Sequence, residues 1–430
     1  MINYKYPKTF PRSEEIKVYI NSEQIDVLKT NVAYFASVAH LEPIDVEITG
    51  FRPIGNITIS PQRLGITAQL GGCTARFRLE TNVLLHISLD GISLPLFFYG
   101  NPEQSYDGRA TYYFAGGQIY EVGEIVLKDH ESVYIEGGAV VKGSIRATGV
   151  SDIRIYGEGV LDGSFFSDTR DYRTILLYQC GDAVIRDIIM IEPPSWMIML
   201  ADCHNVHIDR VKQIGEVKSS DGIDIVGSHE IVIENCILRN NDDCVVIKGF
   251  NWCSHVTGET YQAAHDVYNV RVRACTLVNA QVGHAIEIGH ELMIKEVRNI
   301  TFTDIDIVSV HGHGAPFAIH VGDRALVKDV TFENIRVEHF YDKLIDFRIM
   351  RSRYNIDEER GRVEDILLKD IYVTVSEFNP GYSVSIIGGY DEEHQIKRVT
   401  FENFYLGDKK LTNGNQLDLF LKEASEITFK

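Results

Sequence analysis

Positively charged residues are scarce in this sequence. Its 430 residues include 42 lysines and arginines against 61 aspartates and glutamates, which gives a formal net charge of −19. Such an excess of acid repels phosphate groups, so the composition argues against nucleic acid or an anionic membrane as a partner. It also mildly disfavours a polyanionic substrate, unless a local basic patch overrides the overall charge.

Long hydrophobic runs are missing as well. The opening segment, MINYKYPKTFPRSEE, lacks the apolar core of a signal peptide, and no later run approaches the roughly 20 residues of a membrane span. The seven cysteines are odd in number and have no framework spacing, which predicts free thiols in a reducing compartment. We therefore expect a cytoplasmic protein, or a secreted one if a leader has been removed.

One phrase returns from about Asp152 onward: an acid or asparagine, alternating apolar residues, then a short turn. Repeats of short alternating strands without helical spacing predict a β-solenoid, in which equivalent side chains stack along the axis. Cys236 and Cys275 then form an apolar pair in the interior rather than a redox centre. Aligning eight copies gives one column with separations of 23 to 39 residues: Ile188, Val211, Cys236, Cys275, Ile305, Ile335, Ile371 and Phe404.

The first hundred or so residues lack this phrase. IKVYI, VEITG, NITIS, ARFRLE and LLHISLD are short strands separated by turn residues, which predicts a small β-sandwich. A turn-rich junction, NPEQSYDGRATYYFAGG, follows them. The expected organisation is an all-β protein, with the sandwich over residues 1–105 and the solenoid over residues 106–430.

Three acids interrupt the apolar strands of the solenoid. The segments SDGIDIVG, NDDCVVIKG and VGHAIEIG share a closing glycine. Counting back from that glycine aligns Asp221 with Asp243, and Gly222 with His284. Because strands of adjacent coils lie about 4.8 Å apart, we expect these two aspartates, Asp242 and His284 to gather on one lateral face.

The clustering of carboxylates predicts proton chemistry. Carboxylates held together repel one another, so at least one should have a raised pKa and stay protonated near neutrality. A proton donor beside an ionised carboxylate is what cleavage of a glycosidic bond requires. Two alternatives stay open: polar turn residues, and a Ca²⁺ site, because acids also assemble around hard cations. No ordered loop of alternating oxygen ligands is visible, and we predict no metal and no cofactor.

These motifs resemble those of glycoside hydrolase family 28, the polygalacturonase group. That family carries N-T-D, D-D, G-H-G and R-I-K in this order on a solenoid, and the sequence has S-D-G at 220–222, D-D at 242–243 and G-H at 283–284. The likeness extends from Tyr112 to Lys430 and includes YEVGEIVLKDHESVYIEGGAVVKGSI and IYGEGVLDGS. It implies a right-handed parallel β-helix and hydrolysis with inversion.

The resemblance also implies roles for the clustered residues. By this likeness Asp242 is the general acid, and Asp221 and Asp243 hold and activate the water. His284 supports the acid or the sugar.

The sequence departs from the family pattern at several points. Its first motif reads S-S-D, its third reads G-H-A, and AIHVGDRALVKD stands where R-I-K is expected. In pectin-cleaving members the arginine and lysine grip the substrate carboxylate, so the altered grip leaves room for a neutral sugar. Glycoside hydrolase family 49, the dextranase group, also pairs a β-sandwich with a β-helix and uses three aspartates, which makes an α-glucan a second candidate.

Six further residues are candidates for contacting the sugar. Arg324 has a planar fork suited to a carboxylate or a substrate, with a salt bridge to Asp323 or a neighbouring coil as the alternative. Trp196 and Phe317 are expected near the acid face, where a ring stacks on a sugar or packs in the core. The predicted substrate-binding set is Arg324, Lys328, Trp196, Glu287, His290 and Lys248.

The sequence therefore predicts an inverting glycoside hydrolase that cleaves a pectic or related oligosaccharide or polysaccharide. The alternatives are a dextranase-like α-glucan hydrolase, a non-catalytic carbohydrate-binding solenoid, and a polysaccharide lyase. A lyase needs a basic residue near a uronate and usually Ca²⁺.

Overall fold

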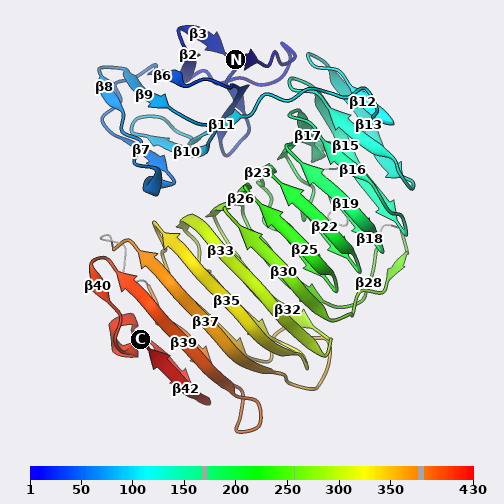
Figure 1. The fold of residues 1–430 in the computed structure, drawn as a ribbon, viewed down its shortest axis with the longest axis vertical. Helices are drawn as coiled ribbons and strands as arrows, with labels where there is room; N and C mark the ends of the chain where they lie inside the picture. Colours follow the sequence, from blue (N-terminus) through cyan, green and yellow to red (C-terminus); the bar gives the residue numbers. More distant parts are fainter. Residues whose placement is uncertain (167–171, 256, 376–381) are drawn as a thin grey trace.

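The protein is built almost entirely from β-strands. The computed structural model describes residues 1–166, 172–255, 257–375 and 382–430. A sheet of 29 strands winds through the larger part of the chain, and smaller sheets form an N-terminal unit beside it (Figure 1). The predicted parallel β-helix preceded by a β-sandwich is therefore confirmed. No helix within the described ranges has the length and apolar character needed to cross a membrane.

Two small sheets pack face to face in the N-terminal unit. Strands such as Ile16–Ile20 alternate buried and exposed residues, so each has one apolar face, and these faces share a core. One sheet contains β1 (Ile2–Asn3), β4 (Leu28–Lys29), β5 (Tyr34–Ala39), β7 (Ile57–Ser60), β10 (Leu84–Leu89) and β11 (Leu96–Asn101). The other contains β2 (Ile16–Ile20), β3 (Glu23–Ile25), β6 (Ile44–Gly50), β8 (Gln69–Gly71) and β9 (Thr74–Leu79). The 3-10 helix η1 (Gln62–Leu64) follows β7.

The chain passes from sandwich to solenoid between Asn101, where β11 ends, and Tyr112, where β12 begins. The expected boundary after residue 105 falls inside this segment. Each coil of the solenoid then contributes strands to three stacks, in which a strand pairs in parallel with its equivalent in the next coil.

The first two stacks are joined by long strands in the later coils. The first contains β12 (Tyr112–Phe114), β14 (Ser132–Ile135), β16 (Arg154–Tyr156), β19 (Gly181–Arg186), β22 (His204–Asp209), β25 (His229–Glu234), β30 (Val267–Arg273) and β42 (Ala424–Phe429). The second contains β17 (Val160–Asp162), β20 (Ile189–Ile191), β23 (Lys212–Ile214), β26 (Ile237–Asn240) and β31 (Thr276–Asn279). Both are continued by β33 (Glu296–Val310), β35 (Leu326–Val337), β37 (Arg362–Val373) and β39 (Ile396–Leu406), and β40 (Lys409–Lys410) pairs with β39.

The third stack carries the acids and is called the site stack below. It contains β18 (Ile175–Tyr178), β21 (Ile198–Ala201), β24 (Ile223–Val226), β27 (Val245–Gly249), β32 (Ile286–Leu292), β34 (Phe317–Val321), β36 (Ile345–Ile349), β38 (Ile386–Gly388) and β41 (Phe420–Lys422). The long strands β13 (Ile119–Leu127) and β15 (Val140–Thr148) begin in the second stack and end in this one. The short helices η2 (Gly163–Phe166) and η3 (Gly414–Leu417) lie outside the stacks.

The column of apolar residues predicted from the repeats lies in the solenoid interior. Ile305 pairs with Ile335, Ile335 with Ile371, and Ile371 with Phe404. All eight members are buried in the solenoid core. Cys236 and Cys275 belong to this core, and all seven cysteines of the chain are free thiols. The apolar interpretation of that pair is confirmed.

The sandwich packs against the second stack. Aromatic residues of β5 and β11, including Phe35 and Phe97, share one apolar cluster with Val160, Ile189 and Ile214. Figure 1 shows the N-terminal unit lying along this side of the solenoid. The domain contact therefore covers a stack other than the one that carries the acids.

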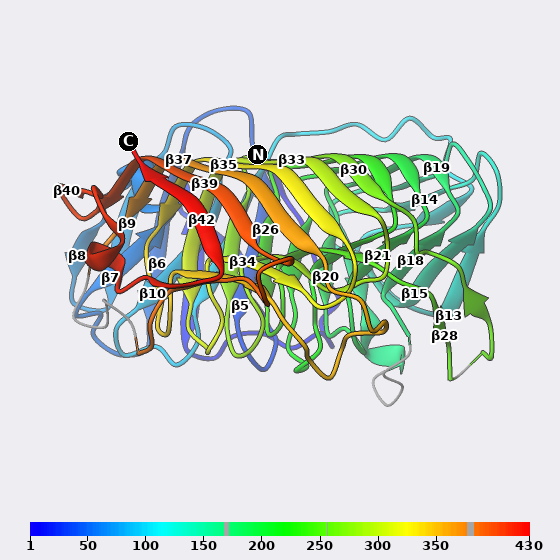
Figure 2. The ribbon, with the colours of Figure 1, turned by 90° about the horizontal axis from the view of Figure 1, so that it is seen from below.

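The long insertion after Gly249 folds back over the outer face of the site stack. It forms a hairpin of β28 (Trp252–Cys253) and β29 (Thr260–Tyr261), which lies at the edge of the early coils (Figure 2). Trp252 and Ala263 pack with Met199 and Val226 in a small apolar cluster. The insertion thus builds up one side of the face on which the acids lie.

Candidate active site

The predicted register of the first two acids is confirmed. Ile223 pairs with Val245 where β24 and β27 meet, which sets Asp221 opposite Asp243. The main-chain N–H of Gly222 donates to the carbonyl oxygen of Asp243 at 2.8 Å. Asp221, Asp242 and Asp243 each bring one carboxylate oxygen to within 4.8 Å of the others. The three acids therefore form one cluster at the start of neighbouring strands.

The predicted register of His284 was wrong by one residue. Ile247 pairs with Ile288, so His284 stands opposite Asp243 and not opposite Cys244. The shared closing glycine misled the alignment, because the pairing of β27 and β32 is irregular after Ile247. Gly289 has a φ of +128°, and a Cβ there would lie 1.9 Å from the carbonyl oxygen of His320.

Gly283, which precedes His284, lies where a side chain would not fit. Its φ is +68°, and a Cβ at this position would lie 2.3 Å from Oδ1 of Asp242. Only glycine combines that backbone conformation with so close an approach. The glycine therefore lets the main chain pass directly over the acid pair.

Burial and mutual repulsion keep protons on the acid cluster. Burial, followed by the charge of Asp221, raises the pKa of Asp242 to about 7. Burial and the charge of Asp242 raise the pKa of Asp243 well above its usual value, and burial raises that of Asp221. Because these groups share protons, the titration belongs to the cluster as a whole. At neutral pH the cluster holds a proton donor beside ionised carboxylate.

Lys248 lies under this cluster, bound to two carboxylates. Its Nζ is 3.0 Å from Asp221 and 3.0 Å from Asp224, and its side chain is 6% exposed. Although burial opposes the charge, these two carboxylates raise the pKa of Lys248 well above its usual value. Nζ also lies 3.8 Å from the ring centre of Trp196. Lys248 thus stabilises the ionised form of Asp221.

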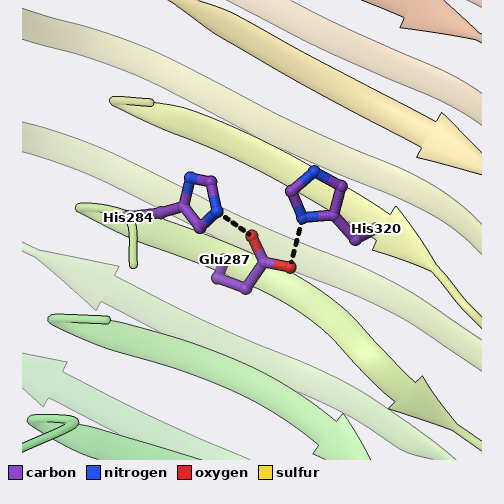
Figure 3. Close-up of side chains that lie close together, drawn as sticks. All are labelled: His284, Glu287 and His320. Carbon is purple, nitrogen blue, oxygen red and sulfur yellow. Dashed lines mark hydrogen bonds and ion pairs between the residues drawn. The ribbon is translucent and has the colours of Figure 1, made fainter. Parts of the chain in front are cut away.

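A second group of side chains lies beyond the acids, on the next coils. Nε2 of His284 is 3.6 Å from one oxygen of Glu287, and Nδ1 of His320 is 2.9 Å from the other (Figure 3). Nε2 of His320 is 3.3 Å from Asp346. Although burial opposes it, the charge of Glu287, together with hydrogen bonds that the ring donates to both carboxylates, raises the pKa of His320 to about 9. His320 is therefore a buried cation held between Glu287 and Asp346.

The hydrogen bonds of His284 define its tautomer. Its Nδ1 accepts from the main-chain N–H of Ala315 at 2.9 Å, so Nδ1 carries no proton. Burial lowers the pKa of His284 to about 4, which leaves the ring neutral with its proton on Nε2. A protonated Nε2 donates towards Glu287 and has no lone pair for a metal. His284, Glu287 and His320 lie close enough to share an ion, but these contacts favour Glu287 as the partner of both rings, through a hydrogen bond with His320 and a 3.6 Å contact with His284.

Two of the predicted substrate-binding residues lie away from the acids. Arg324 binds Asp357 at 2.7 Å and lines a separate groove with His229 and Lys295. Lys328 belongs to β35, outside the site stack, and binds Glu296 at 3.0 Å. Both stand in the segment where R-I-K is expected, but the chain leaves the site stack after β34. Arg324 thus forms a salt bridge to a neighbouring coil, which was the alternative to its predicted contact with a substrate.

The other predicted residues lie on or under the acid face. Trp196 is half-buried beside Asp221, because Ile198 pairs with Ile223, and Arg173 lies 4.5 Å from its ring centre. Glu287 is 1% exposed, and its carboxylate lies between His284 and His320. His290 stacks on His320 with ring centres 4.6 Å apart. Phe317 is fully buried against Phe332, so of the two alternatives, stacking on a sugar or packing in the core, it packs in the core.

Sequence reasoning missed Asp224, Asp346 and Arg348. Asp224 follows Asp221 by three residues in SDGIDIVG, and its burial marks it as a partner of Lys248. Asp346 and Arg348 alternate in LIDFRIM, one coil beyond His320, and Arg348 pairs with His320 in register. Extending the alignment of site-stack strands by two coils would have found both.

The arrangement as a whole suits acid–base chemistry on a polar substrate. Asp242 and Asp243 share the proton of the cluster, while Lys248 stabilises negative charge on Asp221. Inverting glycosidases separate their two carboxyl groups by roughly 6.5–9.5 Å. The oxygens in this cluster approach more closely than that, so inversion stays a prediction that rests on the resemblance.

Comparisons with known proteins show the family and the fold of the chain. The sequence matches the model for glycosyl hydrolases family 28 over residues 128–376, which is more than half of the chain. Exopolygalacturonase X-1 of Emericella nidulans is 31% identical over 115 residues, spanning 23% of this chain and only 26% of that relative.

Two solved structures share the fold. Dex49A from Penicillium minioluteum aligns with a TM-score of 0.67 at 12% identity, covering 100% of this chain and 97% of that one. A hyperthermoactive exopolygalacturonase from Thermotoga maritima aligns with a TM-score of 0.52 at 16% identity, covering 74% and 83%. At these identities the likeness shows architecture alone.

Proposed function

Because the chain belongs to glycosyl hydrolases family 28, we propose that it hydrolyses glycosidic bonds of a pectic oligosaccharide or polysaccharide. One observation carries this proposal: three carboxylates lie within 4.8 Å of one another, and the pKa of Asp242 is about 7. A cluster that holds a proton donor beside ionised carboxylate meets the chemical requirement of glycoside cleavage.

In the proposed reaction Asp242 donates its proton to the glycosidic oxygen as the bond to the anomeric carbon breaks. A water molecule held by Asp221 and Asp243 attacks that carbon, and its proton passes to this pair. Lys248 favours the ionised form of Asp221, and the N–H of His284 favours that of Asp243. The proton taken from water balances the one given by Asp242, so the cluster returns to its starting charge.

The test is a hydrolysis screen with a variant of the proposed acid. Purified protein is incubated with oligogalacturonides, galactan and dextran oligosaccharides, and new reducing ends are measured. We expect release from a pectic substrate and a loss of about 10²- to 10⁴-fold in Asp242→Asn. Asp304→Asn is the matched control, because Asp304 lies on β33 with its side chain 45% exposed and its φ of +54° suits asparagine.

Three outcomes would contradict the proposal. An unchanged rate in Asp242→Asn removes the assigned acid. Binding of sugars without cleavage favours a non-catalytic carbohydrate-binding solenoid. A product that absorbs in the ultraviolet indicates a lyase. Release from dextran alone keeps the hydrolase and replaces the pectic substrate with an α-glucan.

The cytoplasmic location expected from the sequence is part of the same proposal. Seven free cysteines support a reducing compartment. Fractionation of the source cells with an antibody against the protein tests this, and recovery from the medium would contradict it.

A further inference from the structure

We infer that the acid cluster accepts an uncharged sugar unit and disfavours one with a free carboxylate. This inference rests on the proposed function and narrows its substrate. Its basis is the state of the cations around the cluster, because a buried uronate needs a positively charged partner that is available to it.

Lys248 is the cation nearest to the acids, and its contacts are already made. Its Nζ lies 3.0 Å from Asp221, 3.0 Å from Asp224 and 3.8 Å from the ring centre of Trp196. An ammonium group has three donors, and two carboxylates and an aromatic ring already surround this one. A uronate would have to displace a buried carboxylate from this lysine.

The next cations along the site stack are also committed. His320 is held by Glu287 at 2.9 Å and by Asp346 at 3.3 Å. Arg348 contacts both oxygens of Asp346, at 2.6 and 2.8 Å, in a two-pronged pair. His320 and Arg348 therefore share carboxylates of this protein before any ligand arrives.

Lys343 is a further cation on the later coils, and Arg353 lies over the ring of Tyr354 in the loop that follows β36. Lys343 stands two residues before β36, in line with Ala315 and His284. Its Nζ lies 2.6 Å from Asp342 and donates to the carbonyl oxygen of His313 at 2.9 Å. On the other side of the acids, Arg173 lies over Trp196 and its Nη1 is 3.4 Å from Ser195.

Carboxylates outnumber these cations on the same face. Besides the three acids, the face contains Asp224, Glu287, Asp342 and Asp346, and half-buried Glu291 lies close enough for its charge to act on Lys248. A uronate would add like charge to this group, whereas sugar hydroxyls donate hydrogen bonds that carboxylates accept. The face is therefore complementary to a neutral glycosyl unit.

A matched pair of ligands tests this inference. Oligogalacturonides and their fully methyl-esterified forms have the same sugar skeleton and differ in charge at the carboxyl group. The affinity of the Asp242→Asn variant and the kcat/KM of the wild-type enzyme are measured for both ligands. Galactan and dextran oligosaccharides serve as neutral probes. We expect at least about a tenfold preference for the ester over the free acid, or binding of another neutral probe in preference to the acid.

The outcomes separate this inference from the proposed function. Cleavage of the free acid at an equal or higher kcat/KM overturns the inference and leaves the hydrolase in place. Binding of neutral probes without cleavage of any substrate supports the inference and removes the proposed function. Failure of every neutral probe to bind overturns the inference.

Charge variants provide an independent readout. Asp346→Asn removes one carboxylate and releases Arg348, and is expected to raise the ratio of the affinity for the free acid to that for the ester several-fold. Glu291→Gln removes a charge without breaking an ion pair of the His320 group, and should act in the same direction if Asp346→Asn fails to fold. An unchanged affinity ratio in a folded variant would contradict the inference, and Asp304→Asn serves as the control.

Discussion

The main-chain N–H of His284 donates to Oδ1 of Asp243 at 2.7 Å. One coil of the solenoid therefore fixes a carboxylate of the coil before it through its backbone. The imidazole ring of His284 points elsewhere, with Nδ1 accepting from Ala315 and Nε2 directed at Glu287. The position of Asp243 thus depends on the fold of the strand, and the side chain of His284 has a separate role.

Replacing His284 with alanine is expected to lower kcat about 10- to 100-fold, the effect of losing a buried hydrogen bond worth about 1–3 kcal/mol. Because the ring is neutral with a pKa of about 4, the basic limb of the pH profile should stay near its wild-type position. His284→Asn is the matched variant, since its side-chain oxygen can still accept from Ala315. A wild-type rate in His284→Ala would show that the histidine only packs.

The pH dependence of kcat is expected to be bell-shaped. Asp242 must be protonated to act as the acid, and its pKa is about 7, so the rate should fall about tenfold for each pH unit above that value. The acidic limb comes from protonation of Asp221, which must be ionised to take a proton from water and whose ionised form Lys248 stabilises. Initial rates on both sides of neutrality measure both limbs. A rate that keeps rising well above neutral pH is incompatible with this assignment.

Much of this fold could be predicted because its repeats are local. Alternation of apolar residues set each strand's inward face, and the recurring column put Ile305, Ile335 and Ile371 in one interior row. The pairing of Asp221 with Asp243 followed from the same counting. The predicted register failed where strand pairing departs from the repeat, because the irregular pairing at Gly289 moved His284 by one position.

The substrate-binding residues were harder to predict for a related reason. Arg324 and Lys328 are four residues apart, but spacing alone does not reveal that the chain leaves the site stack between them. Ion pairs between coils, such as His320 with Asp346, join segments whose separation varies with the loops. Sequence reasoning therefore found the acids, Lys248 and Glu287, and missed Asp224, Asp346 and Arg348.

Lys248 is expected to be critical for stability as well as activity. Lys248→Met leaves Asp221 and Asp224 as buried, unpaired carboxylates, which should lower the free energy of unfolding by about 3–5 kcal/mol at neutral pH. The folded-state pKa values of both acids are raised, so they take up protons as the pH falls. The deficit should therefore shrink in acid, where neutral carboxyls no longer need the lysine.

Urea unfolding of both proteins at neutral and acidic pH measures this difference. Lys369→Met is the matched control, because Lys369 pairs with Glu333 at the surface, where the two side chains are 34% and 38% exposed. Such pairs contribute about 0–1 kcal/mol. A Lys248→Met deficit no larger than that of the control would contradict the assigned role.

Hydrolysis is expected to invert the configuration at the anomeric carbon. The resemblance to family 28 is the basis of this prediction. Oxygens of the three carboxylates lie closer together than the separation typical of inverting enzymes, so the configuration of the product is a strict test. NMR spectra recorded during the first turnovers identify the anomer that forms before mutarotation. A first product that retains the configuration would assign one aspartate as a nucleophile instead of a base.

If Asp242 gives its proton to the departing sugar oxygen, the loss of activity in Asp242→Asn must depend on the leaving group. For the preferred substrate, kcat/KM of wild-type and Asp242→Asn enzymes is measured with the natural linkage and with a dinitrophenyl leaving group that needs no proton. We expect a loss of about 10²- to 10⁴-fold on the natural linkage and a much smaller loss on the dinitrophenyl glycoside. An equal loss on both substrates would contradict the assignment of Asp242 as the general acid.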